Sequence, residues 1–94
     1  EAAIRRCDLV TVDAVPTALA EAGDLLPLLE KGRLHTRQLV ELGEVIVGRH
    51  AGRTSAEQIT LFESQGMAIQ DLAVALRVLA AAEAKGLGQP IPME

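Results

Sequence analysis

The chain has 94 residues, of which 49% are hydrophobic, so it can bury a core, although Phe62 is its only aromatic residue. Its formal net charge is −4 and its nine basic residues are scattered, which argues against nucleic acid or an anionic membrane surface as a partner. A single cysteine, Cys7, excludes an internal disulfide, and the longest apolar run is too short to span a bilayer, so we expect a cytoplasmic protein.

The first third of the chain alternates between apolar runs and residues that favour turns. The segment from Leu9 to Asp13 is short, rich in β-branched residues and apolar on both faces, which predicts a strand that is covered on both sides. Pro16 fits the first turn of a helix that ends at Gly23. Asp24 is expected to cap a second short helix, which ends at Gly32.

The middle of the chain predicts one more helix and one more strand. Apolar residues keep helical spacing from Thr36 to Ile46, and Gly48 ends this third helix. Residues 49–57 are polar and form a loop. The apolar, β-branched segment from Ile59 to Glu63 is predicted to be the second strand and to lie in the interior of a sheet.

The last predicted helix begins near Gly66 and ends at Lys85, a length of roughly 28 Å. It is rich in alanine and apolar over most of its circumference, so we expect other elements to bury it from more than one direction. Pro90 and Pro92 prevent helix formation in the tail, which is expected to be extended.

The sum of these elements is strand, helices, strand and long helix, which predicts an α/β fold. About 45 residues separate the two strands, enough for a crossover connection that makes the strands parallel. Two parallel strands do not make a stable sheet. We therefore expect the chain to be the C-terminal fragment of a Rossmann-like, doubly wound parallel sheet that ends in a long, alanine-rich helix.

The junction between the second strand and the last helix, Ser64-Gln65-Gly66, is the candidate binding site. In open α/β sheets, ligands bind outside the carboxyl ends of the strands, and Ser64 follows the end of the second strand. Gly66 lets the backbone approach a ligand closely. The alternative is that Ser64 is only the N-cap of the last helix, and both roles are compatible with the sequence.

Six segments, in their order and spacing, carry a resemblance to a known family. They are Leu9–Asp13, Ala20–Leu25, Glu41–Ile46 with Gly48, Gly52–Ser55, Ile59–Ser64 with Gly66, and Ala68–Leu72. Together they resemble the C-terminal part of the ornithine cyclodeaminase/μ-crystallin family, and the resemblance covers nearly the whole chain.

The resemblance implies that residues 1–66 are the C-terminal part of an NAD(P)-binding Rossmann domain. Residues 67–94 would be the long helix and tail that lead towards a dimerisation domain, which implies a homodimer or higher oligomer. The family transfers hydride between NAD or NADP and a small amino-acid or imine substrate, as when ornithine becomes proline and ammonia. Ser64 corresponds to the serine that lies against the cofactor near its nicotinamide end.

The family's glycine-rich phosphate turn, catalytic aspartate and substrate-binding lysine and arginine have no match in this sequence. We therefore assign no catalytic residue, and we expect the chain alone to be inactive and to bind no cofactor. Two alternatives stay open: a self-associating α/β interaction module, and a crystallin-like binding protein without catalysis.

The remaining polar residues are interpreted structurally. Asp13 ends the first strand and is expected to cap the turn that follows it. His35 and His50 lie far from each other and from Cys7, so no metal site is predicted. Asp71 is explained by its favourable position early in the last helix.

Overall fold

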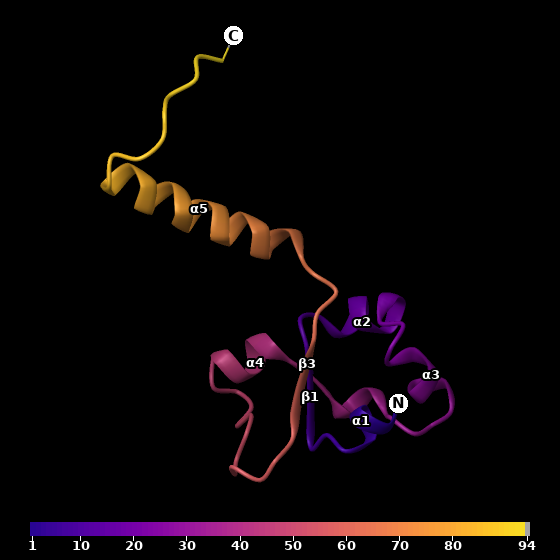
Figure 1. Ribbon diagram of the computed structural model, residues 1–94. Coiled ribbons are helices and arrows are strands. Elements are labelled where there is room, and N and C mark those ends of the chain that lie inside the picture. The colour runs from indigo at the N-terminus through magenta and orange to yellow at the C-terminus, as the bar shows by residue number, and fades with distance from the viewer. Residues whose placement is uncertain (94) are drawn as a thin grey trace.

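A parallel sheet with helices on both sides forms the body of the molecule, and a long helix extends away from it (Figure 1). The computed structural model describes residues 1–93. The helices are α1 (Ala2–Arg5), α2 (Val15–Glu21), α3 (Leu26–Glu30), α4 (Leu42–Ile46) and α5 (Ala68–Ala84), with a 3-10 turn, η1 (Thr36–Gln38), and the strands are β1 (Leu9–Val12), β2 (Leu39–Glu41) and β3 (Thr60–Glu63). All strand pairs are parallel, in the order β2-β1-β3. The predicted α/β class, with a parallel sheet and a long C-terminal helix, is confirmed.

Strand β2 corrects one prediction. The sequence predicts a continuous helix from Thr36 to Ile46, whereas the structure divides this segment into η1, β2 and α4. Backbone pairing explains the difference, because β2 aligns with Val10–Val12 of β1 and thereby gains the hydrogen bonds of a parallel ladder. Among residues 1–93 the sheet therefore has three strands, and β1 lies at its centre.

The core lies between β1 and the two helices that follow it. Val10 and Val12 project from β1 into a cluster with side chains from α2, α3 and the segments next to them. The buried hydrophobic members are Val10, Val12, Ala18, Ala22, Leu25, Leu28, Leu34 and Leu39. Figure 1 shows α2 and α3 on one side of the sheet and α4 on the other. The core is entirely aliphatic, as the composition predicts.

Strands β1 and β3 are joined at both ends by aspartates of the β1 segment. At the amino end, Asp8 Oδ2 accepts a hydrogen bond from the Ile59 N–H at 2.8 Å, and the Asp8 N–H donates to the Ile59 carbonyl at 2.7 Å. At the carboxyl end, Asp13 binds the residues that follow β3. The strand predicted at 59–63 is confirmed. Among residues 1–93 it pairs only with β1, so it lies at an edge of this sheet and not in the interior.

Helix α5 projects away from the sheet, so the molecule measures 55 × 32 × 22 Å along its principal axes (Figure 1). No residue of α5 is buried, and its large apolar side chains remain more than half exposed, including Ile69 at 65% and Leu76 at 58%. The predicted burial of this helix is therefore not provided by residues 1–93. Within the same residues, no helix combines the length and apolar character needed to cross a bilayer.

Candidate functional site at the carboxyl edge of the sheet

The carboxyl ends of β1 and β3 lie side by side because the two strands are parallel and Val12 is paired with Glu63. The residues that follow these ends, Asp13 and Ser64, are therefore brought together although 51 positions separate them. This is the edge of an open α/β sheet at which ligands bind. The sequence singled out both residues but gave no sign that they touch.

Asp13 accepts four hydrogen bonds, three of which come from the β3–α5 junction. Its Oδ1 atom accepts from the N–H groups of Ala14 at 3.1 Å and Gln65 at 3.3 Å. Its Oδ2 atom accepts from the Ser64 hydroxyl at 2.7 Å and from the Gly66 N–H at 2.8 Å. The bond to Ala14 lies in the turn after β1 that Asp13 is predicted to cap, but Asp13 does not cap α2, whose N-cap is Ala14. The other three bonds give Asp13 a second role, as the anchor of the junction.

These donors stabilise the ionised form of the half-buried Asp13 side chain. The Ser64 hydroxyl lowers the pKa of the Asp13 carboxyl most, and the backbone N–H groups of Gly66, Gln65 and Ala14 lower this pKa further, while partial burial acts in the opposite direction. The net shift is downward, so Asp13 is a carboxylate at neutral pH.

Ser64 is exposed and does not cap the helix. Its Oγ atom donates to Asp13 and accepts from the Gly66 N–H at 3.1 Å, whereas α5 begins at Ala68 with Met67 in the N-cap position. The alternative that Ser64 is the N-cap is therefore wrong. Gly66 has φ +84°, and a Cβ atom placed on it would meet no other group within 4 Å. The junction thus presents a hydroxyl group next to open space.

Two glutamates at the ends of the other strands were missed by the sequence reasoning. Glu41, the last residue of β2, accepts the first N–H of α2, from Val15, at 3.0 Å. Glu63, the last residue of β3, accepts the Gln65 side-chain amide at Oε1, whereas its buried Oε2 atom has no partner among residues 1–93. A signal was available in the sequence for Glu63, since it is an acid at the end of an apolar segment, but not for Glu41, which lies within the apolar run from Leu39 to Val47.

The other candidate residues have local structural roles. His50 accepts the Gly52 N–H at Nδ1, at 2.9 Å, and Cys7 donates its thiol hydrogen to the Ala3 carbonyl. His35 takes part in a turn with Gln38. Among residues 1–93, no three His, Cys, Asp or Glu side chains are grouped so that they could hold a metal ion.

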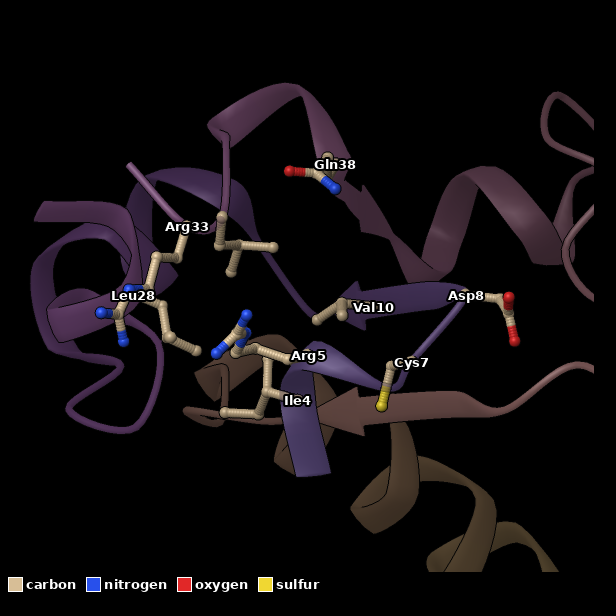
Figure 2. A pocket seen from close by; sticks show the side chains of 9 residues that line it. Ile4, Arg5, Cys7, Asp8, Val10, Leu28, Arg33 and Gln38 are labelled. Carbon is tan, nitrogen blue, oxygen red and sulfur yellow. The ribbon is translucent and has the colours of Figure 1, made fainter. Parts of the chain in front are cut away.

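A small cavity of about 70 Å³ lies at the opposite, amino end of the strands (Figure 2). Side chains from α1, β1 and α3 gather around it, among them Ile4, Val10 and Leu28. Its volume suits about two water molecules, and its Arg33 is already paired with Glu1. We interpret the cavity as a packing gap, because it is remote from the carboxyl edge.

Known proteins are similar to this chain in sequence and in fold. The chain is 38% identical over 90 residues to Delta(1)-pyrroline-2-carboxylate reductase from Bacillus cereus, an alignment that covers 95% of this chain and 28% of the relative. The structure of Thermococcus litoralis Delta(1)-pyrroline-2-carboxylate reductase in complex with NADH and L-proline matches with a TM-score of 0.80 at 30% identity, over 94% of this chain and 27% of that one. An archaeal alanine dehydrogenase dimer with bound NAD matches with a TM-score of 0.73 at 33% identity, over 99% of this chain and 29% of that one.

The chain thus spans between a quarter and a third of the length of these proteins. Residues 1–86 match the sequence pattern of the ornithine cyclodeaminase/mu-crystallin family. This match covers most of the chain, and the parallel sheet agrees with it, so the chain belongs to the ornithine cyclodeaminase/mu-crystallin family.

Proposed function

We propose that this chain works as part of an NAD(P)-dependent enzyme that transfers hydride between the nicotinamide and the C–N bond of a small amino acid or imine. Family membership supports the proposal, as does the similarity to pyrroline-carboxylate reductases and alanine dehydrogenase. The cofactor, when bound, supplies or accepts the hydride. A cyclic imino acid is the substrate that the similarities favour, and the conversion of ornithine to proline and ammonia is the second reaction to test.

The observation that carries the proposal is the exposed Ser64 hydroxyl at the carboxyl edge of the sheet. A dinucleotide contact here is supported by the position of the hydroxyl after the carboxyl end of β3, where ligands of open α/β sheets bind, and by the space beside Gly66, where an added Cβ would meet no group within 4 Å. In this proposal, Ser64 contacts the nicotinamide end of NAD or NADP. Residues 1–66 belong to the cofactor-binding domain, and residues 67–94 lead towards a dimerisation domain.

The experiment compares the complete polypeptide encoded by the gene with residues 1–94 alone. Oxidation of NADH and NADPH is followed with pyrroline-2-carboxylate, and proline and ammonia are measured with ornithine and NAD. We expect the complete polypeptide to reduce the imine and residues 1–94 to bind neither cofactor. Tight binding of NAD by residues 1–94, with turnover of ornithine, would show that the proposed division of the chain is wrong.

A second candidate function is self-association without catalysis, and the exposed apolar face of α5 favours it. Val74 and Val78 are 62% and 61% exposed, an arrangement that a soluble monomer avoids along a whole helix. This candidate predicts dimers or larger assemblies of residues 1–94 in the cytoplasm. Sedimentation at rising concentration measures this, and a monomer at all concentrations contradicts it.

A further inference from the structure

We propose that Asp13 is a positioning residue that orients the Ser64 hydroxyl, so that Ser64 accepts a hydrogen bond from the cofactor and cannot donate one. This inference rests on the proposed contact between Ser64 and the nicotinamide end of the cofactor. It adds the direction of that hydrogen bond and names the residue that sets it.

The Asp13 carboxylate fixes the position of the hydroxyl proton. An ionised carboxylate has no hydrogen to give, so the proton between Ser64 Oγ and Asp13 Oδ2, 2.7 Å apart, must come from the serine. Each Asp13 oxygen receives two donors, which fills the four acceptor positions of a carboxylate. Asp13 therefore has no acceptor position left for a ligand.

Ser64 has one hydrogen-bonding position left. A hydroxyl offers one donor and two acceptor lone pairs. The donor is used by Asp13, and one lone pair faces the Gly66 N–H at 3.1 Å, a single hydrogen that Ser64 shares with Asp13 Oδ2 at 2.8 Å. The second lone pair of this oxygen has no partner among residues 1–93, so the ligand group that can bind Ser64 is a hydrogen-bond donor.

Two groups at the nicotinamide end of NAD carry such a donor, the carboxamide NH₂ and the ribose hydroxyls. The 3-acetylpyridine analogue of NADH separates them, since it keeps the carbonyl and the ribose but lacks the NH₂ group. The inference predicts that Ser64→Ala weakens binding of NADH about three- to tenfold, the effect of losing one neutral hydrogen bond. If the donor is the carboxamide, this loss disappears with the analogue, and if the donor is a ribose hydroxyl, the loss persists.

Asp13→Asn tests the positioning role in the complete polypeptide. Asparagine keeps the shape of aspartate but can present an NH₂ donor to Ser64 Oγ, which frees the serine proton to rotate. The effect of Ser64→Ala on the dissociation constant of NADH is measured twice, in the unmodified protein (the parent) and in the Asp13→Asn variant. We expect the factor by which the dissociation constant changes to differ between the two. An equal factor in both backgrounds overturns the inference. Asp13→Glu, which remains an acceptor only, should restore the parent factor more closely than Asp13→Asn does.

A measurement on residues 1–94 needs no cofactor and separates the two possible failures. The Asp13 carboxyl group is titrated by carbon-13 NMR in the parent and in Ser64→Ala. We expect the pKa of Asp13 to rise in the variant, because its strongest hydrogen-bond donor is removed. An unchanged Asp13 pKa overturns the positioning inference, whereas an unchanged affinity for NADH and its analogue in Ser64→Ala overturns the proposed contact between Ser64 and the cofactor.

Discussion

Replacing Leu25 by alanine tests whether the small aliphatic core holds the molecule together. Leu25 has no exposed surface and lies between α2 and α3, packed with Val12 and Leu28. The substitution removes three buried carbon atoms, a transfer cost of about 2.4 kcal/mol at about 0.8 kcal/mol each. The cavity left behind raises the expected loss to about 3–5 kcal/mol. A 94-residue domain has a free energy of unfolding of about 5–14 kcal/mol, so this single change removes a large part of it.

The matched control is Leu76→Ala on α5, where the same side chain is 58% exposed. We expect this variant to change the free energy of unfolding by less than about 0.5 kcal/mol. Urea denaturation at low protein concentration, followed by far-UV circular dichroism, measures both variants. A loss below about 1 kcal/mol for Leu25→Ala, or an equal loss for the two variants, would refute the assignment of the core.

Substitutions at four further positions test local features. Gly52→Ala should lower the free energy of unfolding by more than about 1 kcal/mol, because φ at this position is +68° and the added Cβ would lie 2.8 Å from Val45 Cγ1. Gly43→Ala lies in α4 with open space around it and should raise the free energy of unfolding by about 0.5–1 kcal/mol. Thermal melting distinguishes the two variants. The contribution of Asp13 to the free energy of unfolding should depend on pH, because folding lowers the pKa of its carboxyl group. This contribution is complete at pH values above the ordinary aspartate pKa of about 3.9, and it is lost as pH falls through the lower pKa of the folded state. The difference in urea midpoint between the parent and Asp13→Asn should therefore be largest near neutral pH and shrink in acid, and a difference independent of pH would contradict this. Glu41→Gln keeps an acceptor for the first N–H of α2 and should leave the free energy of unfolding nearly unchanged. Glu41→Ala should lower it by about 0.5–1.5 kcal/mol, and urea denaturation of the two variants tests this.

Sequence reasoning recovered the parts of the fold that local patterns determine. Strand β1 is short, β-branched and buried, and Pro16 lies in the first turn of α2, so both elements could be predicted. Strand β2 could not be predicted, because Leu39 and Val40 fit the spacing of the helical residues that follow them. They form a strand only because they pair with β1. A three-residue strand carries too little periodicity to be distinguished from one turn of helix.

The sequence predicted where the candidate site lies, but it did not predict the hydrogen bonds between Asp13 and the residues after β3. Ser64 follows the end of a strand, and that is visible in the sequence. Its bond to Asp13 depends on the alignment of β1 with β3, which no local pattern reports because 51 positions lie between the two residues. The same distance explains why Asp13 was predicted to cap only its own turn.

The central position of β1 also has a consequence for synthesis on the ribosome. Translation proceeds at about 5–20 residues per second, so the partner of β1 on the β3 side is made roughly 3–10 seconds after β1 itself. During that interval one edge of β1 can already pair with β2, while the other edge has no partner strand among residues 1–59. Asp8 and Asp13, at the two ends of β1, bond to the residues on either side of β3 and so favour one alignment of β3 against β1. Before β3 is made, they place acidic side chains at both ends of the unpaired edge of β1.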